Sequence, residues 1–172
     1  MTAESPKRKI AMSLKDKLRK IAAEGQRTET DWNIIRDIWL KQVEKLYREI
    51  ENWFGEYFDE GYMRISFREI TLSEEHIGLY QINVMELNIG GPLVVMEPVG
   101  RNILGTAGRI DLYMSGHRAD RIMLLLMSDS KGQPFWELRK RNIRTEKYLF
   151  ERGIFEELIE GWLELYSIRQ EP

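Results

Sequence analysis

The stretch that decides the fold is residues 32–68, WNIIRDIWLKQVEKLYREIENWFGEYFDEGYMRISFR, in which one hydrophobic period replaces another. Between Trp32 and Tyr57 the apolar residues recur at steps of three and four, which is the spacing of one helix face. After Gly61 the period becomes two, as in a half-buried strand. The stretch therefore predicts a helix about 40 Å long, followed directly by a strand.

Working outward from this stretch, the flanking segments complete the predicted architecture. Ser13 and Asp16 have the spacing of a capping box ahead of a short helix over about residues 14–24. No strand–helix–strand alternation follows residue 61, which argues against a parallel doubly wound sheet. We therefore predict an α+β fold: an antiparallel sheet of about six strands, with two N-terminal helices (the second long) and one C-terminal helix packed on one face. The later strands are expected at residues 77–89, 93–96, 109–114, 122–127 and 135–140, and the last helix at about 149–167.

The composition is that of a globular chain with one core. The 172 residues are 42% hydrophobic and 31% charged, and we expect a basic flexible arm over residues 1–12 and a single domain over 13–172. The absence of cysteine excludes disulfides, thiol catalysis and Cys-ligated metal sites. Together with a charged first segment and no apolar run of membrane-spanning length, it leads us to expect a cytoplasmic protein that binds no membrane.

The net charge of −2 is an average over four alternating blocks. Residues 1–20 hold 7 basic and 2 acidic side chains, and residues 21–97 hold 7 and 15. Residues 98–147 hold 10 and 5, and residues 148–172 hold 2 and 6. The helices are thus mostly acidic, while the arm and the later strands are basic. Such segregation favours a polarised binding surface over a catalytic one.

The sequence contains no complete cofactor-binding or metal-binding motif. Gly100 and Gly105 have the spacing of P-loop glycines, but Thr106 stands where the lysine belongs, and a strand follows instead of a helix. His76 and His117, the two histidines of the chain, are far apart in turn-like contexts. We therefore expect no cofactor and no metal, and judge enzymatic activity uncertain but less favoured than binding.

A loose resemblance to the PD-(D/E)xK metal-dependent nucleases rests on four residues: Asp111, Asp129, Lys131 and Glu137. In such enzymes a strand aspartate and a second acid hold Mg²⁺, while a lysine orients the attacking water. Departures from that pattern are Asp129, which falls in a turn, and Arg139, which stands where a lysine would follow Glu137. The resemblance implies a nuclease centred on Asp111, with Asp129, Lys131 and Glu137 as its other residues.

A second alternative is a nucleic-acid-binding module. Aromatic side chains beside arginines on an antiparallel sheet can stack bases and clamp phosphates. The basic arm and the strand from Trp136 to Arg144 would supply this surface, although edge charges also protect a strand against unwanted pairing. The candidate binding residues are Arg101, Arg109, Trp136, Arg139, Arg141 and Arg144.

The hypothesis that the residues favour is a non-enzymatic interaction protein, of the accessory, adaptor or immunity type, that binds another protein. Acidic side chains between residues 44 and 60, and again between 151 and 164, suit a basic partner. The second apolar face of the long helix suggests a possible homodimer through residues 32–58.

Overall fold

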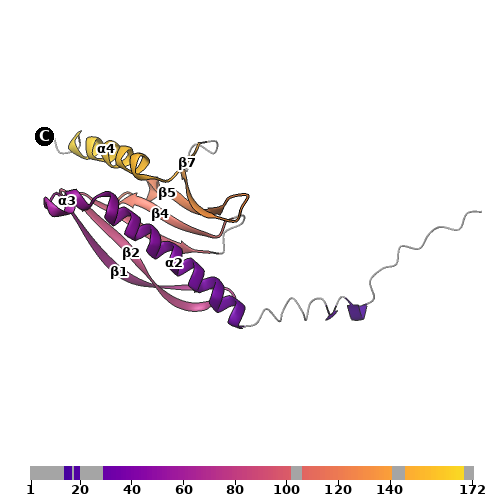
Figure 1. Ribbon diagram of the computed structural model, residues 1–172. Helices are drawn as coiled ribbons and strands as arrows, with labels where there is room; N and C mark the ends of the chain where they lie inside the picture. The colour runs from indigo at the N-terminus through magenta and orange to yellow at the C-terminus, as the bar shows by residue number, and fades with distance from the viewer. Residues whose placement is uncertain (1–13, 17, 20–28, 102–105, 141–145, 169–172) are drawn as a thin grey trace, which may run out of the picture.

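The computed structural model of the chain describes residues 14–16, 18–19, 29–101, 106–140 and 146–168 (Figure 1). Residues 14–16 and 18–19 are helical, within the short helix predicted for 14–24. The predicted arm over residues 1–12 lies outside the described residues.

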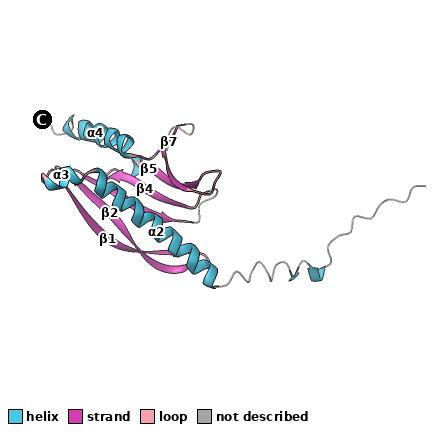
Figure 2. Ribbon diagram, in the orientation of Figure 1, coloured by secondary structure: helices cyan, strands magenta, loops and turns pink. Residues whose placement is uncertain are grey.

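Seven strands form one antiparallel sheet in which every strand pairs with the next along the chain, and helices flank it in sequence (Figure 2). This confirms the predicted α+β class, with one strand more than expected. The elements are α2 (Glu29–Trp53), α3 (Gly55–Asp59), β1 (Met63–Glu74), β2 (Gly78–Ile89), β3 (Leu93–Gly100), β4 (Gly108–Met114), the 3₁₀ turn η1 (Arg118–Asp120), β5 (Ile122–Ser128), β6 (Pro134–Lys140), β7 (Lys147–Leu149) and α4 (Arg152–Ile168).

Helix α2 forms because its apolar stripe can be buried on the sheet along its whole length. Trp39, Leu46 and Ile50 lie on that stripe and are inaccessible to solvent or nearly so. Burying a side chain of this size contributes roughly 1.5–3 kcal/mol, which exceeds what helix propensity alone supplies. In Figure 1 the helix runs along one face of the sheet, starting from the end next to α3.

Helix α4 packs against the same core as α2. Phe155 and Ile159 belong to the hydrophobic cluster that also contains Phe54, the residue between α2 and α3. The rings of Phe54 and Phe155 are 5.5 Å apart in an edge-to-face arrangement. The two long helices therefore share one face of the sheet, as predicted.

Two details differ from the sequence-based expectation. The long helix stops at Trp53, because Phe54 leaves helical geometry (φ −111°, ψ 14°) before the short helix α3 begins. The three-residue strand β7 was not predicted, since a segment this short shows no alternation that a pattern could detect.

The first hairpin bends out of the sheet halfway along. Strands β1 and β2 pair without a register break from Met63↔Ile89 to Glu74↔Gly78, but β2 pairs with β3 only from Met85 to Asn88. Ile82 and Met85 both belong to the core cluster, although their separation places them on opposite sides of a regular strand. A bend shared by both strands accounts for this change of side.

The other face of the sheet is covered by no helix among the described elements. Val84, Val95 and Leu125 are nonetheless buried there, apart from the main cluster, beneath long arginine and glutamate side chains. No helix in the described part of the chain combines the length and the apolar character needed to cross a membrane.

Candidate functional site

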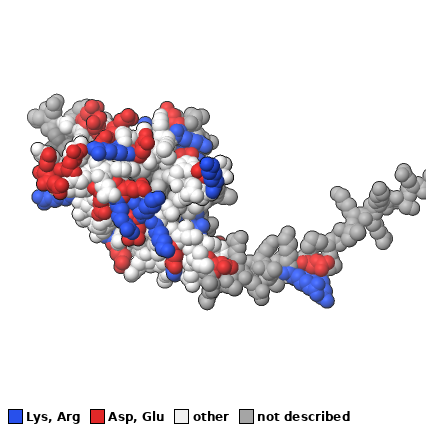
Figure 3. Space-filling view, in the orientation of Figure 1, with Lys and Arg blue, Asp and Glu red and all other residues white. Residues whose placement is uncertain are grey.

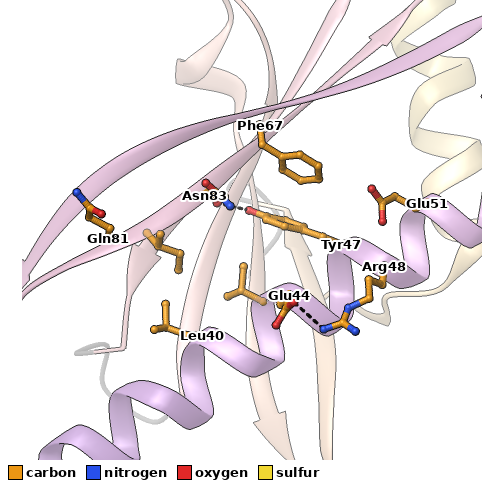
Figure 4. Close-up of a pocket in the computed structure, with 10 residues that line it drawn as sticks. Leu40, Glu44, Tyr47, Arg48, Glu51, Phe67, Gln81 and Asn83 are labelled. Atoms are coloured by element: carbon orange, nitrogen blue, oxygen red, sulfur yellow. Dashed lines mark hydrogen bonds and ion pairs between the residues drawn. The ribbon is translucent and has the colours of Figure 1, made fainter.

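A groove of about 570 Å³ opens between one flank of α2 and the β1–β2 hairpin (Figure 4). It lies where the paired hairpin continues beyond the last β2–β3 pair, Met85↔Met96. Its floor is mainly apolar and its rim is polar, the composition expected of a site that binds part of another molecule. The lining residues are Leu40, Val43, Glu44, Tyr47, Arg48, Glu51, Phe67, Gln81, Ile82 and Asn83.

Tyr47 occupies the inner wall of the groove at the point where the hairpin leaves the sheet. Its hydroxyl lies 2.9 Å from the carbonyl oxygen of Asn83 and 3.2 Å from that of Met96, so its proton is donated to the bend. Asn83 has no partner in β3, because the pairing of β2 with β3 ends at Met85↔Met96. Burial raises the pKa of Tyr47 well above its ordinary value, so the hydroxyl stays protonated at neutral pH.

Phe67 forms the outer wall of the groove. Its ring lies 5.9 Å from that of Tyr47, yet its side chain is 46% exposed. Figure 4 shows the Phe67 ring standing above the Tyr47 ring, with open space on its other side. An aromatic side chain that is held on one face and open on the other is a typical anchor for a partner.

The rim of the groove is acidic. Arg48 is 2.7 Å from Glu44, one turn earlier in the helix, so these two charges compensate each other. Glu51 forms no ion pair among the described residues and faces the space beside Phe67 (Figure 4). Across the groove the hairpin contributes Gln81 and Asn83, which are neutral. The rim therefore carries about one uncompensated negative charge.

The arginines predicted to bind phosphates mostly serve ion pairs within the protein. The Arg109 guanidinium donates to Asp111 at 2.6 and 3.1 Å, and Arg139 is paired with Glu137 on the same face. Arg101 donates its backbone N–H to Glu74 at 2.9 Å and its Nε–H to the carbonyl of Ala107 at 3.2 Å. Arg141 and Arg144 lie outside the described residues.

Trp136 lies on the opposite side of the sheet from Arg139. Its side chain is 7% exposed and belongs to the main core, where its ring is 6.1 Å from that of Trp39. A base could therefore not stack on Trp136 without opening the contact with α2. The structure does not place this aromatic side chain and the arginines on one accessible surface.

The four residues of the nuclease alternative do not converge. Asp111 is 3% exposed and is held by Arg121 at 3.0 Å as well as by Arg109. Glu137 is on the same face but two strands away, about 10 Å across the sheet. Asp129 accepts the backbone N–H groups of Lys131 and Gln133, both at 2.8 Å, and so stabilises the β5–β6 turn.

The same face carries further arginine–carboxylate contacts. Glu97 accepts the Tyr113 hydroxyl at 2.6 Å and lies 3.2 Å from Arg118, while Arg68 donates to Glu86 at 3.1 Å. Burial and the nearby Glu97 raise the pKa of Tyr113 to about 12. These contacts join β1 to β2 and β3 to β4 across the uncovered side of the sheet, and each of these charged groups has its counter-charge close by.

Within the described ranges, no three His, Asp or Glu side chains gather in a way that could hold a metal ion. No protein-family model, curated protein or solved structure matches the chain. The groove and its surroundings are therefore the features of the chain that bear on its function.

No periodic pattern in the sequence marks the groove. Tyr47 lies at the flank of the apolar helix stripe, and one polar atom on a mostly apolar residue has no periodicity. The apolar residues of β2 change side between Ile82 and Met85, at the bend beside the groove, and this change is a signal within the sequence. The step of two after Gly61 places Phe67 on the apolar side of its strand, whereas the structure leaves it 46% exposed.

Proposed function

We propose that the protein is a non-enzymatic interaction module that binds a segment of another protein in the groove between α2 and the β1–β2 hairpin. The observation that carries this proposal is the open groove itself, with Phe67 half-exposed at its edge. An apolar floor of this size suits several side chains of a polypeptide segment better than a small polar substrate.

The chemistry of the partner segment follows from the lining. Apolar side chains of the partner would pack against Leu40, Ile82 and Phe67, and their burial would supply most of the binding free energy. Glu51 forms no ion pair in the described chain, so a lysine or arginine of the partner, next to those apolar side chains, would pair with it. The acidic side chains of α3 would attract the same basic segment over a longer range (Figure 3).

The test is selection of peptides from a phage-displayed random library on the immobilised full chain, followed by fluorescence anisotropy with the selected synthetic peptides. We expect peptides that combine apolar residues with at least one Lys or Arg. Phe67→Ser and Glu51→Lys should each weaken their binding roughly tenfold or more, which corresponds to about 1.4 kcal/mol. Gln81→Trp, which fills the groove from the hairpin side, should do the same.

The matched controls lie outside the groove. Leu79 is on the same hairpin and 73% exposed, and Glu164 is an exposed acid on α4. Leu79→Ser and Glu164→Lys should change the affinity by less than about twofold. Equal loss in Phe67→Ser and Leu79→Ser would contradict the groove, as would binding of a single-stranded oligonucleotide, with steep salt dependence, by a chain that selects no peptide.

A further inference from the structure

The edge of the sheet next to the groove is a free strand edge of unusual length. Strand β1 has twelve residues, and every one of them pairs with β2 on one side only. In an antiparallel strand, alternate residues direct their N–H and C=O groups to each side. The outer side of β1 therefore presents a row of backbone donors and acceptors with no strand beside it in the described chain.

We infer that the partner segment binds as an added eighth strand along β1, an inference that rests on the proposed function of the groove. An added strand would lie about 4.8 Å outside β1 and would satisfy its free backbone groups. Alternate side chains of that strand would then point towards α2, into the space beside Phe67. The groove and the free edge would thus bind the two halves of one ligand, its side chains and its backbone.

The apolar residues of β1 support this geometry. Four of them pack against the core cluster but are only partly buried: Met63, Ile65, Ile70 and Leu72. By strand alternation, Met63 and Ile65 share a side with Phe67, which is 46% exposed. A neighbouring strand along this first half of β1 would bury more of these three side chains.

The edge has only some of the devices that prevent strand addition. Natural edges are commonly shortened or interrupted by proline and lysine, and β1 contains neither residue. It does carry four charged side chains, those of Arg64, Arg68, Glu69 and Glu74. Its Arg68 is tied to Glu86 of the neighbouring strand at 3.1 Å, so it does not project over the free edge. Arg64, on the uncovered face, forms no ion pair among the described residues and would favour an acidic side chain on that side of the added strand.

The probe is a synthetic peptide of about nine residues in which Ile and Thr alternate, with one central Ile replaced by Arg. A series of its backbone N-methyl variants is titrated against the full chain by fluorescence anisotropy. N-methylation at every second position should lower the affinity roughly tenfold, because those N–H groups would pair with β1, whereas methylation at the intervening positions should change it less than about twofold. Hydrogen–deuterium exchange should slow for alternate amides of β1 on binding.

The possible outcomes separate this inference from the proposed function. Binding that depends on Phe67 but responds equally to methylation at all positions would overturn strand addition and leave the groove as the binding site. The same conclusion would follow if library peptides bind in a Phe67-dependent manner while the alternating probe does not. If no peptide binds with any dependence on Phe67, the proposed function itself is wrong, and strand addition with it.

Discussion

At the scale of single residues, Tyr47 links the core to the candidate groove. Its ring packs in the hydrophobic cluster, and its hydroxyl reaches the carbonyls of Asn83 and Met96 at the bend. The hydroxyl therefore compensates for backbone pairing that the sheet loses where the hairpin leaves it.

We expect Tyr47→Phe to lower the free energy of unfolding by about 1 kcal/mol at neutral pH, since one buried hydrogen bond is lost and the ring is kept. Burial raises the pKa of Tyr47 above its unfolded value of about 10, so its share of stability is complete below pH 10 and is lost as the pH rises further. Urea unfolding at neutral pH and at about pH 11 should show a smaller alkaline loss for Tyr47→Phe. An identical loss in both proteins would show that another group controls it.

Gly108 and Trp39 form a second pair at this scale. A Cβ on Gly108 would overlap the six-membered ring of Trp39, which has no solvent exposure. Gly108→Ala should therefore cost about 1–3 kcal/mol and Trp39→Ala about 3–5 kcal/mol, with the double variant losing less than the sum. Urea unfolding of the four proteins gives the coupling energy. Gly153→Ala, where a Cβ meets nothing within 4 Å, is the control and should cost nothing.

At the scale of elements, the outer half of the β1–β2 hairpin is held by Tyr80 and Ile82, which lie in the core cluster, and by one hydrogen-bonded carboxylate. The Glu74 carboxylate accepts the Tyr80 hydroxyl and, at 2.9 Å, the backbone N–H of Arg101 at the end of β3. This joins the two segments that the bend separates, which the β2–β3 ladder no longer does beyond Met85.

We expect Glu74→Ala to loosen that half of the hairpin selectively. Hydrogen–deuterium exchange should accelerate for residues 70–83 and remain nearly unchanged for 85–88, which β3 still pairs. The neighbouring exposed Glu75 is the control, and Glu75→Ala should leave both segments unchanged. Equal acceleration in both segments would mean that Glu74 acts on global stability instead.

At the scale of the whole molecule, a single cluster of buried side chains runs from α2 through the sheet to α4. Both helices lie on this cluster, so neither can leave without exposing the core that the other needs. In Figure 3 the acidic side chains gather towards the α3 end of the view.

A homodimer through residues 32–58 stays a prediction. The helix stripe that contains Trp39 is buried within the chain. The exposed Ile34 and Ile38 are therefore the apolar residues that a second copy would contact.

We expect one cooperative unfolding transition, because the main core cluster joins both long helices to the sheet. Urea curves followed by tryptophan fluorescence and by far-ultraviolet circular dichroism should coincide. Fluorescence reports on the five tryptophans, of which Trp39 and Trp136 are buried together, while circular dichroism reports all helices and strands. Separate midpoints would show that α4 or the hairpin unfolds on its own.

Much of the fold could be predicted from periodicity. The step of three and four after Trp32 and the step of two after Gly61 each encode a local choice, and each was confirmed. The predicted helix through Tyr57 was wrong at its end, because α2 stops at Trp53 and Phe54 is not helical. The site residues proposed from charge patterns stay predictions, because an arginine looks the same in sequence whether it binds a ligand or, like Arg109, pairs with its own Asp111.

The sequence by itself determined the order of helices and strands, the antiparallel class and the apolar faces, because these depend on neighbours within a few positions along the chain. Only the tertiary structure decided which strand edge stays free, how far α2 covers it, and that Phe67 and Glu51 border one groove. Those properties depend on the crossing angle of α2 and on the bend shared by β1 and β2. Both arise from packing between residues distant in sequence, and no local pattern records them.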